Sequence, residues 1–264
     1  KKALCGLRVA PKKWGTLRDV TMSDAIIQYG KSNGRCHQCE GVKNAWQVIN
    51  DENSIVGHFL MYVDDVLVTA STEWTLAIMK AFQANWKCKF TGGLVRDGVA
   101  TDEATNAIAF LGITIEEGNG GLILHQREYI EAKLKQRNLL QSEGRDALVM
   151  PSEGIRRPAT QEEKETVSYK EALEKAQCEV GSIQWVALKT RPDVACAAAI
   201  AASVQTRGPE EAIRLSEGMW SYLAKRRDLC MAVAPQKDTP LTVGISADCL
   251  LYTSPSPRDV EESG

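Results

Sequence analysis

The most apolar part of the chain consists of two short runs, residues 59–63 and 66–70, which are separated by Asp64 and Asp65. Two apolar runs with a two-residue gap are typical of an antiparallel β-hairpin, and Asp tolerates the left-handed backbone that such a turn requires. Because both runs are apolar at nearly every position, the pattern predicts strands at the centre of a packed sheet, joined at the two aspartates.

Spacings of three and four residues predict helices before and after a second hairpin. Residues 74–86 carry an apolar side chain at every fourth position, which predicts an amphipathic helix capped by Ser71 or Thr72. Residues 110–126 contain apolar runs on both sides of the turn sequence GNGG and predict a hairpin. The amphipathic residues 127–139 predict a helix with a basic outer face.

The remaining sequence predicts a connector, a helical region and a last strand. Residues 141–167 are polar, contain Pro and Gly, and predict the connector. Helical patterns then follow at residues 169–188, 192–206 and 208–228. Residues 241–248 predict a strand that reaches Asp248, and the Ser-Pro-rich residues after it are typical of disorder.

The amino-acid composition excludes few classes of protein. The chain has 264 residues, 44% of them hydrophobic, and a net charge of −2, which is ordinary for a globular protein with one large core or two smaller ones. The first eighteen residues nevertheless contain six Lys or Arg and no acidic residue. Such a stretch fits either a phosphate-binding surface or a solvated face.

Eight cysteines are scattered along the chain, without a secretory signal or an apolar run long enough to cross a membrane. They indicate free thiols in a reducing compartment. Cys36 and Cys39 alone have metal-ligand spacing, but zinc needs two further ligands, so a zinc site is the less favoured interpretation. Cys178 and Cys196 lie within helical patterns and are expected to be buried.

The paired aspartates have two interpretations. In the first, Asp64 and Asp65 are turn residues in solvent. In the second, they lose hydration at the end of a packed sheet, which costs several kcal/mol per ion unless a cation compensates. Mg²⁺ takes oxygen ligands, and two such ions about 3.5–4 Å apart can activate an attacking hydroxyl and stabilise a leaving pyrophosphate.

Read as a whole, YVDD at residues 62–65 resembles the palm hairpin of reverse transcriptases. Other segments, in the same order, are similar to copia-type retrotransposon polymerases. They are the upstream segment LCGLRVAPKKW (4–14), the primer-grip segment FLGITIEE (110–117), the helix HQREYIEAKL (125–134), a distal region containing TRPD (179–212), and LTVGISAD (241–248), which resembles the first strand of ribonuclease H. The resemblance runs from residue 1 to residue 248.

This resemblance implies an α+β fold: an antiparallel palm sheet with the YVDD hairpin packed by helices, followed by a mainly helical thumb and connection. The implied parts are a partial palm (1–126), thumb and connection helices (127–238), the first strand of ribonuclease H (239–248) and a non-native or disordered tail (249–264). Since the family's third catalytic carboxylate precedes residue 4, the chain is expected to be truncated at both ends.

The resemblance also implies site residues. The catalytic and metal-binding residues are Asp64 and Asp65, with Asp248 as a metal ligand of ribonuclease H. The expected metal is Mg²⁺, in two ions, with Mn²⁺ as an alternative. The residues implied to contact nucleic acid or nucleotide are Tyr62, Val63, Lys12, Leu111 and Gly112. The basic residues expected to follow the nucleic-acid backbone are Lys133, Lys135 and Arg137, although a solvated helix face would look the same.

The implied function is RNA-directed DNA synthesis, by a fragment expected to be inactive in isolation. Its implied partners are an RNA or DNA template-primer duplex, deoxynucleotides and the rest of the Pol polyprotein, with no membrane. The implied location is intracellular, in a cytoplasmic particle or the nucleus. One alternative is a decayed or repurposed nucleic-acid-binding module without catalysis, which Val9, standing where the family usually has Gln, supports. Another is a structural domain in which Asp-Asp is only a turn.

Overall fold

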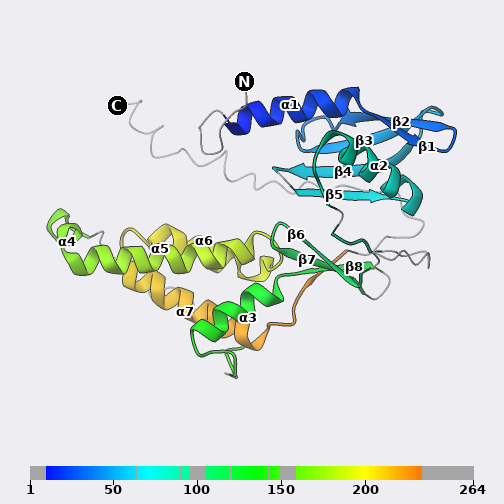
Figure 1. The fold of residues 1–264 in the computed structure, drawn as a ribbon. Helices are drawn as coiled ribbons and strands as arrows, with labels where there is room; N and C mark the ends of the chain where they lie inside the picture. Colours follow the sequence, from blue (N-terminus) through cyan, green and yellow to red (C-terminus); the bar gives the residue numbers. More distant parts are fainter. Residues whose placement is uncertain are drawn as a thin grey trace, which may run out of the picture. The chain divides into compact units, whose positions relative to one another are not determined.

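The computed structural model describes residues 10–63, 65–89, 91–94, 105–118, 121–141, 143–148 and 159–233. The described residues form an α+β fold with two antiparallel sheets, one of five strands and one of four (Figure 1). The α+β class predicted from the sequence is therefore confirmed. Each sheet is described below with the helices that pack around it.

The first sheet is a meander in which each strand pairs with the next one along the chain. Its strands are β1 (Ile26–Tyr29), β2 (Ser32–Gln38), β3 (Ala45–Asn50), β4 (Ile55–Tyr62) and β5 (Asp65–Ala70). The helices α1 (Ala10–Asp24) and α2 (Thr72–Asn85) contribute Met22, Trp74, Ile78 and Phe82 to the core on one face of this sheet. As predicted, Ser71 caps α2, because its side chain accepts a hydrogen bond from the backbone N–H of Trp74.

The other face of the first sheet is not covered by any helix that the structure describes. In β4, the side chains of Phe59 and Met61 are buried, whereas the alternate residues His58 and Tyr62 are exposed. The prediction of a central hairpin, buried on both faces, was wrong: β5 lies at the edge of the sheet, and β4 buries one face only. On the open face, the two runs place the opposed pair Leu60 and Leu67, both of which are half-buried.

Aromatic side chains connect the first sheet to both helices. Trp46 stacks on Phe59 at 5.9 Å between ring centroids, and Phe59 meets the edge of Phe82 at 5.2 Å. Phe82 in turn contacts Trp86, and Trp86 packs against Trp14 of α1, each at 5.8 Å. Such pairs stabilise a core beyond the area that they bury. This series fixes the N-terminal end of α1 against the end of α2.

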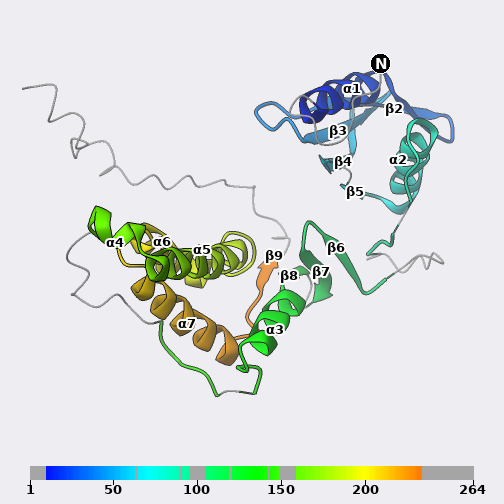
Figure 2. The ribbon, with the colours of Figure 1, turned by 60° about the vertical axis from the view of Figure 1, so that its left-hand side comes forward.

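The second sheet combines the predicted hairpin with two strands that sequence patterns did not predict. Its strands are β6 (Ala107–Phe110), β7 (Ile113–Gly118), β8 (Gly121–His125) and β9 (Met231–Val233). The hairpin predicted within residues 110–126 is confirmed as β7 and β8. The strand β9 comes after the last described helix and pairs with β8, so the sheet joins distant parts of the chain (Figure 2).

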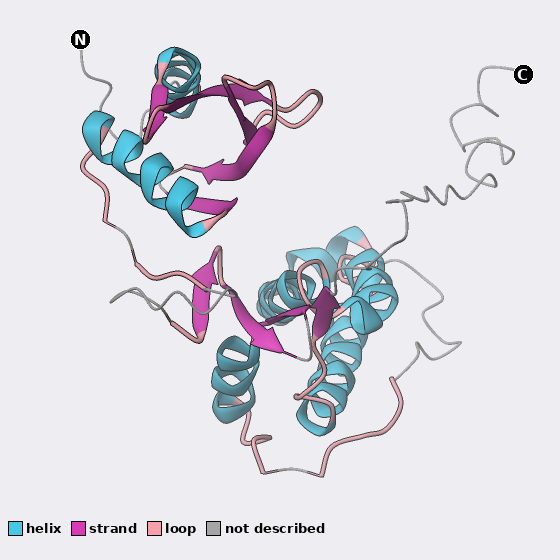
Figure 3. Cartoon of the chain, turned by 90° about the vertical axis from the view of Figure 1, so that its right-hand side faces the viewer, coloured by secondary structure: helices cyan, strands magenta, loops and turns pink. Residues whose placement is uncertain are grey.

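The helices that follow β8 enclose a second hydrophobic core (Figure 3). They are α3 (Arg127–Gln136), α4 (Gln161–Glu165), α5 (Val167–Ala187), the short 3₁₀ helix η1 (Pro192–Val194), α6 (Ala195–Val204) and α7 (Pro209–Lys225). The helix predicted after the second hairpin and the three later helices are therefore confirmed. The first core draws on residues 22–88 and the second on residues 129–224, which agrees with the expectation of one large core or two smaller ones.

Two ion pairs connect these helices. Glu179 of α5 accepts hydrogen bonds from the indole of Trp220 on α7, at 2.9 Å, and from the guanidinium of Arg137, just after α3. Arg191, which is 1% exposed, donates two hydrogen bonds to Asp193, at 2.9 and 2.7 Å. Burial raises the pKa of the Asp193 carboxyl, but these bonds and a further one from Tyr222 outweigh it and hold the pKa below its usual value.

The cysteines correct one prediction. Cys178 and Cys196 are exposed on the outer faces of α5 and α6, so the expectation that they are buried was wrong. Cys36 is buried in the first core, and this burial raises the pKa of its thiol to about 12.

Other predictions fall on residues that the structure does not describe. Asp248, the strand predicted at residues 241–248, the ribonuclease H segment 239–248 and the tail 249–264 lie outside the described residues. A membrane-spanning helix, which must be both long and apolar, is not found in the described part of the chain.

Candidate functional site

The β4–β5 hairpin places its turn one residue earlier than predicted. Tyr62 pairs directly with Asp65, so the two turn residues are Val63 and Asp64. Asp65 is then the first residue of β5, and its side chain is exposed. Asp64, the residue for which a catalytic role was primarily expected, lies outside the described residues.

Val63 adopts a backbone conformation that its side chain disfavours. Its φ angle is +53°. A positive φ is rare for a β-branched residue and costs about 1–2 kcal/mol, although two-residue hairpin turns require it. The side chain is 57% exposed and recovers little of this cost through burial. Strained turns of this kind persist where the surrounding structure holds them.

Trp14 supplies such a contact. Its indole N–H donates a hydrogen bond of 3.0 Å to the carbonyl oxygen of Val63. The indole is held in turn by its edge-on contact with Trp86. Trp14 is the last residue of the upstream segment LCGLRVAPKKW, so two motifs that are far apart in the sequence meet at this turn. No sequence pattern indicated this role of Trp14.

A second connection joins α1 to the same hairpin. Arg18 is 6% exposed and forms an ion pair of 2.7 Å with its neighbour Asp19. It also donates a hydrogen bond to the side chain of Asn44 at 3.3 Å. The backbone oxygen of Asn44 accepts a hydrogen bond from the N–H of Met61 at 2.8 Å, two residues before the turn. Two hydrogen bonds therefore hold the end of β4: one from Met61 to Asn44, and one from Trp14 to Val63.

The hairpin presents its polar side chains on the open face of the sheet. Tyr62 and Asp65 are a directly opposed pair, and opposed residues in an antiparallel pair share one face. Tyr62 is 51% exposed. Among the described residues, no cationic side chain lies within ion-pair distance of Asp65. The expectation that this aspartate loses hydration in a packed sheet was therefore wrong; its carboxylate is available to an external cation, on a face that no described helix covers.

Lys12 belongs to the same region of the first sheet. It is exposed in the first turn of α1, two residues before Trp14. Because Trp14 contacts the turn at Val63, this basic residue belongs to the helix turn that lies against the hairpin. The structure therefore brings together three of the predicted positions, Tyr62, Val63 and Asp65, whereas the side chain of Lys12, two residues from Trp14, lies on a different side of α1.

Leu111 and Gly112 form the turn of another hairpin. Phe110 pairs with Ile113, and the two residues between them have φ angles of +51° and +74°, which fits a type I′ turn between β6 and β7. Trp185 of α5 packs against this turn, because a Cβ atom added to Gly112 would lie 3.1 Å from Cζ2 of the indole. The FLG sequence indicated the segment, but no local pattern indicated its contact with Trp185.

The three basic side chains in and near α3 differ in how closely other side chains of the protein contact them. The amino group of Lys133 lies 5.6 Å from the centre of the Tyr129 ring, and Lys135 is exposed. Arg137 is bound to Glu179 and stacks on Trp220 at 4.5 Å, with only 17% of its side chain exposed. Lys133 and Lys135 are therefore more accessible to a nucleic-acid backbone than Arg137 is.

A cluster of three or more His, Cys, Asp or Glu side chains that could enclose a metal is not found in the described ranges. Those ranges include Asp65 but neither Asp64 nor Asp248. The chain matches no protein-family model, no curated protein and no solved structure. A function must therefore be proposed from the motifs and from the local geometry around them.

Proposed function

We propose that the chain is part of an RNA-directed DNA polymerase of a copia-type retrotransposon. Residues up to 126 belong to a palm, and residues 127–238 belong to a thumb and connection. The observation that carries the proposal is the contact between Trp14 and Val63. It joins the upstream motif to the YVDD turn, at the end of a hairpin whose exposed carboxylate faces the open side of an antiparallel sheet.

The arrangement of the first sheet supports this proposal. A polymerase palm has to seat a nucleic-acid duplex beside its carboxylates, so one face of its sheet must stay free of helices. Here the core with α1 and α2 occupies one face, and Tyr62 and Asp65 lie on the other.

The proposed reaction is nucleotidyl transfer. The 3′-hydroxyl of a primer attacks the α-phosphate of a deoxynucleotide, and pyrophosphate leaves. Asp64 and Asp65 would hold Mg²⁺, or Mn²⁺, which when bound neutralises charge on the phosphates and favours deprotonation of the hydroxyl. Tyr62 and Val63 offer exposed surface near the primer end, and Lys12 offers a positive charge. Leu111 and Gly112 would contact the primer strand.

Asp65 meets the basic chemical requirement for such a metal. Its carboxylate is exposed and lacks a cationic partner in the part of the chain that the structure describes. Hard cations such as Mg²⁺ prefer carboxylate oxygens and retain water in their remaining positions. One carboxylate alone binds Mg²⁺ weakly, so the proposal requires its neighbour Asp64 as well.

The proposed partners are a template-primer duplex, deoxynucleotides and the rest of the polyprotein, inside the cell.

Thermal unfolding with added Mg²⁺ tests the proposal on the chain as it is. A ligand that binds only the folded state raises Tm, and we expect millimolar MgCl₂ to do so relative to KCl of equal ionic strength. The double variant Asp64→Asn/Asp65→Asn should lose this rise, whereas Asp24→Asn, at the exposed end of α1, should keep it. A wild-type Tm that does not respond to Mg²⁺ would favour an Asp-Asp sequence that serves only as a turn.

Duplex binding separates the proposal from a nucleic-acid-binding module without catalysis. Both functions predict binding that weakens as salt is added, because phosphate contacts release counterions. Only the polymerase requires that Mg²⁺ strengthen the binding of a template-primer together with the matching deoxynucleotide, and that Asp64→Asn remove this gain. Binding that is indifferent to both Mg²⁺ and Asp64→Asn would support the module.

A further inference from the structure

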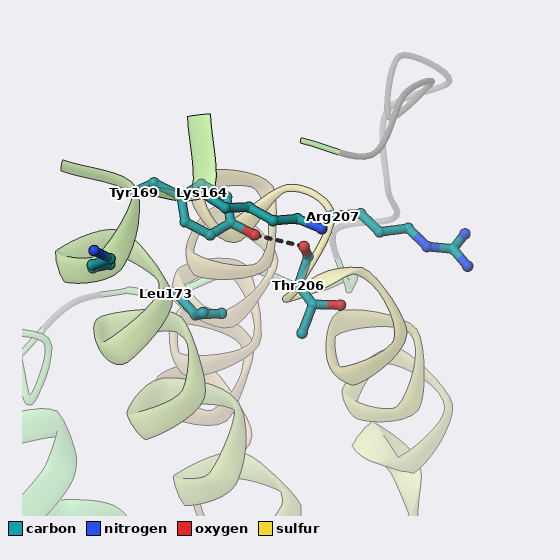
Figure 4. Close-up of a pocket in the computed structure, with 6 residues that line it drawn as sticks. Lys164, Tyr169, Leu173, Thr206 and Arg207 are labelled. Atoms are coloured by element: carbon teal, nitrogen blue, oxygen red, sulfur yellow. Dashed lines mark hydrogen bonds between the residues drawn. The ribbon is translucent and has the colours of Figure 1, made fainter. Parts of the chain in front are cut away.

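A basic hollow lies at one end of the second helical core, separate from both hairpins. It has a volume of about 580 Å³ and is formed by α4, the first turns of α5 and the turn between α6 and α7. The residues that line it are Lys164, Tyr169, Lys170, Leu173, Thr206 and Arg207 (Figure 4). Neither the motifs nor the proposed polymerase reaction assigns it a role.

The wall of the hollow is fixed by a contact between distant residues. The hydroxyl of Tyr169 donates a hydrogen bond of 2.6 Å to the backbone oxygen of Thr206, shown as the dashed line in Figure 4. This bond holds the ring of Tyr169 against the α6–α7 turn. The ring and the side chain of Leu173 give the hollow an apolar surface between its charged groups.

The charges that line the hollow are all positive. Lys164, Lys170 and Arg207 contribute cations, and the lining contains no acidic side chain. None of the three has an ion-pair partner among the residues that the structure describes. The acidic Glu163 and Glu210 line the adjoining hollow instead. The positive charge is confined to the lining, because Glu162 and Glu165 of α4 and Glu171 of α5 adjoin Lys164 and Lys170 in the sequence, and the lining itself offers three cations to an anion.

The directions of the side chains decide which kind of anion fits. In Figure 4, Lys164 extends across Tyr169 toward Thr206, whereas Arg207 points away from Tyr169. The positive groups are therefore spread over the end of the helices and do not converge on one point. A single phosphate cannot contact them all, but successive phosphates of one strand can.

We propose that this hollow binds single-stranded nucleic acid. Cations that follow the backbone, with an aromatic ring between them on which a base can stack, are the features that proteins use for single strands. In a duplex the faces of the bases are already stacked on one another, so the ring of Tyr169 has no base to receive. The site does not involve Asp64 or Asp65, and its existence does not depend on polymerase activity.

Fluorescence anisotropy of a labelled single-stranded oligonucleotide over a range of NaCl concentrations tests the proposal. For single strands, the slope of log K against log salt is about −0.7 per phosphate contact. We expect the triple variant Lys164→Ala/Lys170→Ala/Arg207→Ala to make this slope less steep by about 2 and to weaken binding at low salt. The control Lys80→Ala/Lys87→Ala/Lys175→Ala removes the same charge from exposed lysines outside the hollow and should have a much smaller effect.

The tyrosine provides a second, uncharged test. Tyr169→Ala should weaken single-strand binding by about tenfold or more, because a stacking surface is lost, while Tyr169→Phe should retain it. Equal losses in the two triple variants would overturn the proposal, as would a Lys164→Ala/Lys170→Ala/Arg207→Ala variant that loses as much duplex binding as single-strand binding. The triple variant of the hollow should leave the Mg²⁺-dependent rise in Tm unchanged, so failure of this site and failure of the polymerase function are distinguishable.

Discussion

The indole N–H of Trp14 donates a hydrogen bond to the carbonyl oxygen of Val63, across forty-nine residues of sequence. This bond holds the first of the two turn residues, and the other is Asp64. Because Val63 has a positive φ angle, the turn needs such support. A helix far upstream in the sequence thus supports the backbone of the hairpin at Val63, the residue that precedes Asp64 in the sequence.

Replacing Trp14 with Phe should separate this hydrogen bond from the packing of the ring. Trp14→Phe removes the N–H but retains an aromatic contact with Trp86, so we expect the free energy of unfolding in urea to fall by about 1 kcal/mol. The control Trp86→Phe makes the same change in ring size at a side chain without a hydrogen bond to the turn. Equal effects of the two variants would show that the bond to Val63 contributes nothing.

The strain at Val63 predicts that a residue which tolerates a positive φ stabilises the chain. Val63→Asn should raise the free energy of unfolding by about 1 kcal/mol, since Asn adopts the left-handed region more readily than a β-branched residue. Val42→Asn is a suitable control, because Val42 is 53% exposed, close to the 57% of Val63, and lacks a positive φ. Destabilisation by Val63→Asn, measured in urea, would contradict a strained turn.

Gly112 should be intolerant of a side chain, for two reasons that act together. Its φ angle is +74°, and an added Cβ would lie 3.1 Å from the indole of Trp185. We expect Gly112→Ala to lower the free energy of unfolding by about 1–2 kcal/mol. Gly181→Ala provides the contrast, because Gly181 lies within α5 with open space around it and should stabilise the helix by about 0.5–1 kcal/mol. The opposite signs are measurable by thermal or urea unfolding.

Asp193 should make stability depend on pH in the acid range. Although burial raises the pKa of its carboxyl, the hydrogen bonds from Arg191 dominate and the pKa lies below its usual value. A depressed carboxyl pKa contributes stability that is complete above the unfolded-state pKa and is lost as pH falls through the folded-state pKa. The contribution of Asp193 should therefore be present at neutral pH and decline below about pH 4.

Asp193→Asn tests this dependence directly. At pH 7 the variant leaves the buried Arg191 without a counter-ion, and we expect a loss of about 3 kcal/mol. The difference from wild type should narrow below about pH 4, where the wild-type carboxyl also becomes neutral. Asp146→Ala, at an ion pair in which Asp146 is 64% exposed, should change the free energy of unfolding far less than Asp193→Asn does. A difference between wild type and Asp193→Asn that stays constant with pH would contradict the assignment.

Sequence patterns predicted those helices and strands whose own apolar residues recur at a regular spacing. The helix α2 carries its buried side chains four residues apart, and Ser71 precedes it as a cap. The helix α1 was not predicted, because its inward positions are the half-buried Trp14 and the buried Arg18 and Met22, and an arginine interrupts the apolar stripe. Arg18 is buried only because Asp19 and Asn44 provide polar partners, and Asn44 is far from it in the sequence.

The first three strands were missed for a related reason. Their inward positions include Gly34 and Cys36, which are too small to produce an apolar pattern. Gly34 is required here, since a Cβ atom would lie 2.7 Å from Cγ1 of Val48 and 3.0 Å from the Trp74 ring. The turn at Val63 and Asp64 was placed one residue late because strand register depends on pairing across the sheet, which the sequence of a single strand does not specify.

Primer extension by a chimera tests the central claim most directly. The chain is joined behind an upstream palm segment of a copia-type polymerase that carries the third carboxylate. It is assayed with template-primer, deoxynucleotides and Mg²⁺, alongside its Asp64→Asn, Asp65→Asn and Asp24→Asn variants. We expect the unmodified chimera and Asp24→Asn to extend the primer, Asp64→Asn to abolish extension and Asp65→Asn to reduce it. Equal extension by the unmodified chimera and by Asp64→Asn would contradict the proposed function.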